Sequence, residues 1–151
     1  MSVRNHTVTK ARVRILLVYD NANGLAARKS VLQELGHVVL TATSGVDALD
    51  HFAAEPFDLV VTDYNMPRMD GLELIGRLRG QAPALPIILL SGFSEALGLA
   101  EASTGADVVL QKSANEVTHL IRAVNRLLRR KPAAKKPPTS QSALKAKRKT
   151  V

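Results

Sequence analysis

The chain has 151 residues and a formal net charge of +8, and 46% of its residues are hydrophobic. This length and apolar fraction suffice for one domain with a buried core, and they argue against disorder of the body. The absence of cysteine excludes disulfides, thiolate metal sites and cysteine nucleophiles. No apolar run is long enough to span a membrane, and the N-terminus lacks the apolar segment of a secretory signal. We therefore expect a cytoplasmic protein without a membrane contact.

The positive charge is concentrated at the two ends of the chain. Residues 1–14 carry four basic and no acidic side chains, and residues 131–151 carry seven basic and no acidic side chains. Residues 15–130 carry 10 basic and 13 acidic side chains, a formal charge of −3. This distribution predicts a mildly acidic domain over residues 13–130, between a basic arm at residues 1–12 and a basic tail.

The tail, residues 131–151, is rich in Lys, Ala and Pro and is expected to be disordered. Two interpretations of it remain open. It either keeps the protein in solution or makes a weak, non-specific contact with nucleic acid through counterion release. It has no aromatic residue that could stack on a base.

The body alternates apolar runs with segments whose apolar residues have helical spacing. Ser44 and Asp70 are suited to cap helices, and Gly36 and Gly80 are suited to end them. In chain order, the predicted elements are a strand at 11–19, a helix at 24–36, a strand at 37–43, a helix at 44–56, a strand at 57–62, a helix at 70–80, a strand at 86–91, a helix at 94–105, a strand at 106–111 and a helix at 113–130. Five apolar strands, each followed by a helix, predict an α/β fold with a doubly wound parallel sheet and helices on both faces.

Polar residues follow or end four of these strands. They are Asp20, Asp63, Ser91 and Lys112. In open α/β sheets, ligands bind at the carboxyl ends of the strands, so these side chains are candidates for one site. A carboxylate can accept a phosphoryl group if the incoming charge is neutralised, and Mg²⁺ or a lysine can do this.

The segment VVTDYNMPRMDG at residues 60–71, taken with the other strand-end residues, resembles the receiver domain of bacterial two-component response regulators. The resemblance is to the chemotaxis-type single-domain receiver and covers about residues 13–130. It implies a flavodoxin-like strand order of 2-1-3-4-5. In that order the first and third strands are neighbours, so Asp20 and Asp63 would face each other across the crevice.

The resemblance also implies a role for each candidate residue. Asp63 would be the phosphoacceptor, with Ser91 and Lys112 in contact with the phosphate. Asp20, Asp63 and the backbone carbonyl of Asn65 would bind Mg²⁺. The phosphoryl group would come from a histidine kinase or a phosphotransfer protein, and an output protein, unidentified by the sequence, would receive the signal. Such a protein signals through protein–protein contacts and is not an enzyme, apart from self-phosphorylation by a phosphodonor.

Three residues depart from the family pattern. Tyr19 stands where the family usually has an acid, so we interpret it as a packed aromatic residue and expect weak Mg²⁺ binding. Val109 replaces the usual aromatic residue three positions before Lys112, which predicts a muted conformational response. Ser113 replaces the usual proline, which favours a trans peptide bond and a shifted Lys112.

Two functions are consistent with these residues. The first is a phosphorylated single-domain response regulator, favoured by Asp20, Asp63, Ser91 and Lys112. The alternative is a degenerate receiver that is never phosphorylated and acts as a constitutive adaptor or as a protein tethered to DNA or another polyanion. The three departures favour the alternative.

Overall fold

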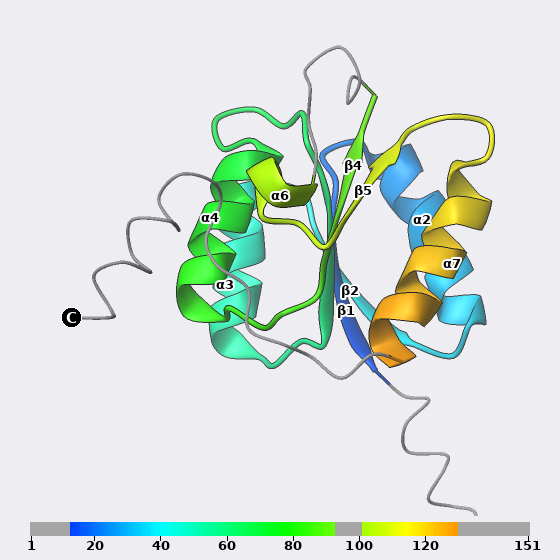
Figure 1. Ribbon diagram of the computed structural model, residues 1–151, viewed down its shortest axis with the longest axis horizontal. Coiled ribbons are helices and arrows are strands. Elements are labelled where there is room, and N and C mark those ends of the chain that lie inside the picture. The colour runs from blue at the N-terminus through cyan, green and yellow to red at the C-terminus, as the bar shows by residue number, and fades with distance from the viewer. Residues whose placement is uncertain (1–12, 93–100, 130–151) are drawn as a thin grey trace, which may run out of the picture.

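The structure, a computed structural model, describes residues 13–92 and 101–129 (Figure 1). These residues form one sheet of five parallel strands in the order β2-β1-β3-β4-β5. The strands are β1 (Arg14–Val18), β2 (Val38–Ala42), β3 (Leu59–Asp63), β4 (Ile87–Ser91) and β5 (Val108–Gln111). The predicted parallel sheet and the strand order implied by the resemblance are both confirmed.

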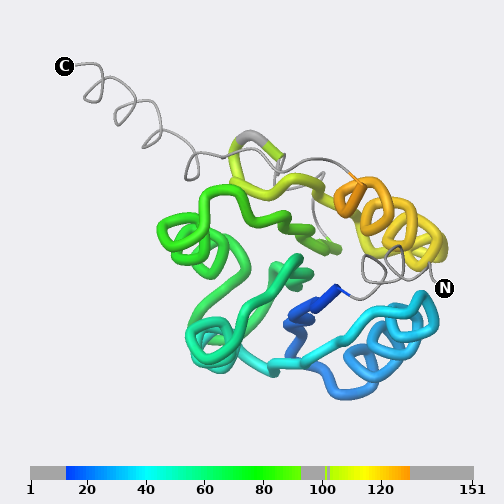
Figure 2. The backbone as a smooth tube through the Cα atoms, turned by 90° about the horizontal axis from the view of Figure 1, so that it is seen from below, coloured from blue at the N-terminus to red at the C-terminus, as the bar shows by residue number. Residues whose placement is uncertain are grey.

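Helices cover both faces of the sheet, as a doubly wound fold requires. They are α2 (Ala22–Glu34), α3 (Gly45–Ala54), α4 (Gly71–Gln81), α6 (Glu101–Thr104) and α7 (Glu116–Arg129). Helices α2 and α7 lie side by side on one face, and α3 and α4 lie on the other (Figures 1 and 2). None of the helices in the described part of the chain is long and apolar enough to cross a membrane.

Some predictions fall on residues that the structure does not describe. The basic arm at residues 1–12 and the tail at residues 131–151 lie outside the described residues. The predicted helix at 94–105 does so in large part, and its described portion is α6.

Side-chain caps determine where three helices begin. The side chain of Ser44 accepts a hydrogen bond from the backbone N–H of Asp47 at the start of α3, and that of Asp70 does the same for Glu73 in α4. Both caps match the prediction. Helix α2 starts two residues earlier than predicted because Asn21 is its cap and accepts from the backbone N–H of Gly24 at 2.9 Å.

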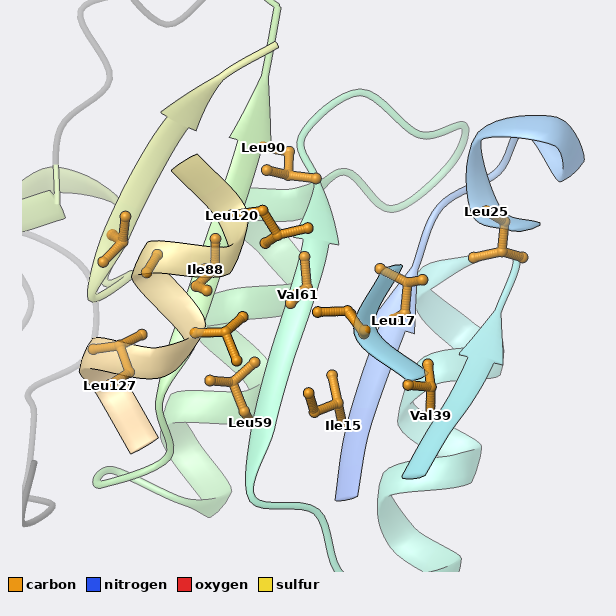
Figure 3. Close-up of a cluster of buried hydrophobic side chains, with 14 residues drawn as sticks. Ile15, Leu17, Leu25, Val39, Leu59, Val61, Ile88, Leu90, Leu120 and Leu127 are labelled. Carbon is orange, nitrogen blue, oxygen red and sulfur yellow. The ribbon is translucent and has the colours of Figure 1, made fainter. Parts of the chain in front are cut away.

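Alternation along each strand divides the core between the two faces of the sheet. In β1, Ile15 and Leu17 pack beneath α2 and α7, whereas Leu16 and Val18 pack beneath α3 and α4. Figure 3 shows the first of these clusters, to which β1, β2, β3, β4, β5, α2 and α7 all contribute residues. Burial on both faces explains why the strands read as continuous apolar runs.

A buried ion pair connects α4 to the segment before β5, at the amino ends of the strands. Arg79 of α4 and Asp107, which precedes β5, are 0% and 3% exposed in their side chains, with Nη2 and Oδ2 2.9 Å apart. The same Oδ2 accepts the backbone N–H of Ile87 at the start of β4. Burial lowers the pKa of Arg79, and Asp107 opposes that shift. Arg79 also donates to the carbonyls of Pro83, Leu85 and Gly105.

Candidate functional site

The four predicted strand-end residues lie along the carboxyl edge of the sheet. Asp63 ends β3 and Ser91 ends β4, while Asp20 follows β1 and Lys112 follows β5. The ladder continues past the strand ends, since the backbone N–H of Lys112 donates to the carbonyl of Ser91 at 3.0 Å. The backbone N–H of Tyr64 donates to the carbonyl of Leu90 at 2.8 Å. Parallel pairing therefore holds these polar residues at one edge.

Asp63 and Lys112 form an ion pair at the centre of this edge. Nζ of Lys112 lies 2.5 Å from Oδ1 of Asp63, whose side chain is 4% exposed. Lys112 is thus the partner of this buried oxygen, for which the described residues supply no further hydrogen bond. Burial raises the pKa of Asp63, and the negative charge of Asp20 adds to the effect, while Lys112 and the backbone of Tyr64 oppose it.

A close backbone approach places the loop after β3 beside Asp63. The N–H of Gly71 donates to the carbonyl of Tyr64 at 2.8 Å. A Cβ atom at Gly71 would lie 2.5 Å from the carbonyl oxygen of Asp63 and 2.8 Å from Cα of Tyr64. Backbone atoms cannot move aside as a flexible side chain can, so glycine allows α4 to begin this close to the phosphoacceptor candidate. The sequence indicated a turn at Gly71 but not this steric requirement.

Oxygen ligands for a hard cation are present at the edge. Asp20 is exposed, and its charge influences the pKa of Asp63, so the two carboxylates interact. The buried Oδ1 of Asp63 already faces the ammonium cation of Lys112, and Asn65 lies two residues further along in an exposed position. Residues 13–92 and 101–129 hold no group of three or more His, Cys, Asp or Glu side chains placed to share a metal. The residues thus fit Mg²⁺ with few anionic ligands.

Tyr19 packs at this edge, in agreement with its interpretation as a packed aromatic residue. Its ring is half-buried against the core cluster beneath α2 and α7. Two cations approach the ring: Cζ of Arg28 lies 4.2 Å from the ring centroid, and Nζ of Lys112 lies 4.8 Å from it. Both distances are within the range of cation–π attraction.

Arg28 connects this ring to α7. Its Nε donates to Oε2 of Glu116 at 2.6 Å, and Nη1 donates to the carbonyl of Gly24 at 3.1 Å. Burial, the largest single influence, lowers the pKa of Arg28, but the hydrogen bond and charge of Glu116 together with Tyr19 outweigh burial, so the pKa is raised. Sequence reasoning missed Arg28 and Glu116, because a charged residue on an amphipathic helix ordinarily belongs to its solvated face.

The other two departures from the family pattern can also be located. Val109 is partly buried and packs against the core cluster beneath α3 and α4. All peptide bonds in the described ranges are trans, including the bond before Ser113. Lys112 nevertheless reaches Asp63, so any shift of the lysine does not remove it from the site.

Residues 15–125 match the family model described as the response regulator receiver domain. The chain is 39% identical over 122 residues to the response regulator MprA of Mycobacterium tuberculosis, and the alignment covers 78% of this chain and 51% of MprA. The chain therefore spans about half the length of that relative.

Solved structures agree with this similarity. The crystal structure of the response regulator protein TrrA from Thermotoga maritima in complex with Mg²⁺-BeF aligns with a TM-score of 0.70 and 36% identity, covering 76% of this chain and 98% of that one. The chemotaxis protein CheY4 of Vibrio cholerae aligns with a TM-score of 0.68 and 29% identity, covering 78% of this chain and 99% of that one.

Proposed function

Because this chain belongs to the family of response regulator receiver domains, which act in two-component signalling, we propose that Asp63 is its phosphoacceptor. The observation that carries the proposal is the ion pair of Asp63 with Lys112 at the carboxyl edge of the sheet. A carboxylate and a cation that could neutralise an incoming phosphoryl group lie 2.5 Å from each other in this pair. The donor would be a phosphohistidine on a histidine kinase or phosphotransfer protein.

In the proposed transfer, a carboxylate oxygen of Asp63 attacks the phosphorus atom of the phosphohistidine. A P–O bond forms, the P–N bond breaks, and the imidazole leaves with the electron pair of that bond. The raised pKa of Asp63 makes its carboxylate a more basic nucleophile. Lys112 pairs with the transferred phosphoryl oxygens, and the hydroxyl of Ser91, buried at the end of β4, donates to one of them.

The metal site that we propose consists of Asp20, Asp63 and the backbone carbonyl of Asn65. Mg²⁺ bound there would neutralise charge on the transferring phosphoryl group. Binding would be weak because Tyr19 supplies no carboxylate where the family pattern has one.

The output of the domain would pass through protein–protein contacts, and one surface supports this. A groove of about 460 Å³ lies between β5 and α7. Its apolar floor is formed by Val108, Leu110 and Ala123, and its polar rim includes His119, Arg122, Arg126 and Arg129. We propose that an acidic segment of an output protein binds here, since its charge would complement the arginines.

Three further points concern the class of protein, its location and its contact with nucleic acid. Family membership establishes a signalling domain rather than a conventional enzyme. The cytoplasmic location remains a prediction. The comparisons give no support to the predicted nucleic-acid contact of residues 131–151, which lie outside the described residues.

The test is incubation with acetyl phosphate and Mg²⁺ followed by intact-mass measurement. We expect a mass gain of one phosphoryl group that is lost in Asp63→Asn and reduced by EDTA. Asp50→Asn, an exposed change on α3, is the matched control and should retain the gain. No gain at any Mg²⁺ concentration would favour the alternative, a degenerate receiver that acts as a constitutive adaptor. The observation in favour of that alternative is the tyrosine in place of an acid at position 19.

A further inference from the structure

We infer that Tyr19 is a positioning residue for Lys112. Its ring holds the lysine ammonium beside Asp63 before any phosphoryl group arrives, and the ion pair of Arg28 with Glu116 holds the ring. This inference rests on the proposed role of Asp63 in phosphoryl transfer.

The first step of the argument concerns the two contacts of the Lys112 ammonium. Nζ lies 2.5 Å from Oδ1 of Asp63 and 4.8 Å from the centroid of the Tyr19 ring. A lysine carries a compact charge on a flexible four-carbon stem, so one contact leaves the stem many conformations. A second contact, with the negative face of an aromatic ring, restricts the ammonium to the space between the carboxylate of Asp63 and the ring of Tyr19.

The second step concerns the ring itself. Cζ of Arg28 lies 4.2 Å from the ring centroid, and the absence of a Cβ atom at Gly24 makes room for the ring. An added Cβ would overlap Cε2 of Tyr19 and approach Nη1 of Arg28 to 2.8 Å. The ring is therefore fitted between the first turn of α2 and the lysine.

The third step concerns charge. Two cations beside one ring repel each other unless each is compensated by an anion. Glu116 compensates Arg28 at 2.6 Å, and both side chains are nearly buried, at 9% and 12% exposed. Asp63 compensates Lys112. From Asp63 to Glu116 each cation thus has an anion on one side and the ring of Tyr19 on the other. Tyr19, which stands where the family usually has an acid, would anchor Lys112.

A first experiment measures the geometry without phosphorylation. In protein with ¹³C-labelled lysine, the Hε protons of Lys112 should show an upfield ring-current shift, assigned by the loss of that signal in Lys112→Arg. The shift should persist in Tyr19→Phe, which keeps the ring, and disappear in Tyr19→Leu, which keeps apolar bulk. An unshifted Lys112 signal in the wild type, or the same signal in the Phe and Leu variants, would overturn the inference.

A second experiment measures the consequence for phosphoryl transfer. With acetyl phosphate as donor, Tyr19→Leu should react about two- to fivefold more slowly than the wild type, the factor that corresponds to loss of one partly exposed cation–π contact. Tyr19→Phe should react at close to the wild-type rate. Equal rates for the Phe and Leu variants would overturn the role of the ring, whereas loss of the reaction in the wild type would refute the proposed function instead. In that case the lysine signals alone decide whether Tyr19 positions Lys112.

A further variant tests the inference even if Tyr19→Leu does not fold. Gly24→Ala leaves Tyr19 unchanged but displaces its ring by overlap with Cε2. Its thermal unfolding should stay cooperative, its Lys112 signal should move toward that of an ordinary lysine, and its reaction should slow as in Tyr19→Leu. A Gly24→Ala protein that retains both the shift and the rate would contradict the inference.

Discussion

Lys112 contacts Asp63 across an intervening strand. Asp63 ends β3 and Lys112 follows β5, with β4 between them, yet Nζ lies 2.5 Å from Oδ1. A long side chain is needed to cross that strand, so a shorter cation could not take the place of this lysine. The pKa of the Asp63 carboxylate is raised even with Lys112 beside it, and burial is the main cause.

The first prediction concerns stability as a function of pH in metal-free buffer. Because burial raises the pKa of Asp63 above its unfolded value of about 3.9, the folded protein binds a proton more tightly than the unfolded chain. The free energy of unfolding should therefore fall as pH rises from the unfolded pKa through the folded pKa. Asp63→Asn should be more stable than wild type at pH 7, and the difference should narrow toward about pH 3.

Urea unfolding of both proteins with EDTA present, across this pH range, measures the effect. Asp50→Asn, at an exposed position on α3, is the control and should follow the wild type. A wild-type protein that gains stability relative to Asp63→Asn as pH rises would contradict the raised pKa.

The second prediction concerns Mg²⁺. Tyr19→Asp should tighten Mg²⁺ binding by at least about tenfold, because it adds a carboxylate beside Asp20 and Asp63. Tyr19→Asn removes the ring without adding charge and is the control. Isothermal titration with MgCl₂ measures the change, and equal affinities for the Asp and Asn variants would show that position 19 does not face the metal.

The third prediction compares two glycines of the same helix. Gly71→Ala should destabilise the fold by about 1–3 kcal/mol, because the added Cβ meets the backbone of Asp63 and Tyr64 at 2.5 and 2.8 Å. Gly76→Ala should stabilise it by about 0.5–1 kcal/mol, because nothing lies within 4 Å of the new Cβ. Chemical unfolding of both variants provides the measurement. Similar effects of the two changes would mean that the turn after β3 can relax away from Asp63.

The fourth prediction separates a buried ion pair from an exposed one. Asp107→Ala should cost about 3–5 kcal/mol, since it leaves Arg79, fully buried, without its carboxylate. Glu73→Ala breaks the exposed pair with Arg77 on the same helix α4 and should cost less than about 1 kcal/mol. Unfolding free energies of the two variants test this, and a small loss in Asp107→Ala would mean that water reaches Arg79.

The fifth prediction concerns the response to phosphorylation. With Val109 in place of an aromatic residue, we expect small NMR shift changes over β5 and α7 when the protein is phosphorylated. Val109→Tyr, at a partly buried position beside the second core cluster, should enlarge them. Chemical shift maps before and after treatment with acetyl phosphate provide the measurement. Changes in the wild type as widespread as those in Val109→Tyr would show that another residue carries the response.

Much of the fold could be predicted from local sequence patterns. Apolar runs of strand length, apolar residues at helical spacing, and caps such as Ser44 and Asp70 are local properties, and the structure has the corresponding elements. The segment around Asp63, together with three other strand-end residues, also indicated where a site would form. This worked because parallel strands bring their carboxyl ends to one edge whatever the loops between them do.

The tertiary structure decided which side chains meet at that edge. Arg28 and Glu116 are separated by 88 positions, and their pairing depends on α2 and α7 lying side by side. Tyr19 could merely fill space or contact two cations. Which of these occurs depends on the absence of a Cβ atom at Gly24, which makes space for the ring, and on the length of the Lys112 side chain, which brings Nζ to the ring. Sequence patterns record how a residue relates to its near neighbours along the chain, whereas contacts of this kind depend on distances of a few ångströms between distant segments. The sequence by itself therefore determined the elements and the edge where the site lies, and packing determined the partners of each charge.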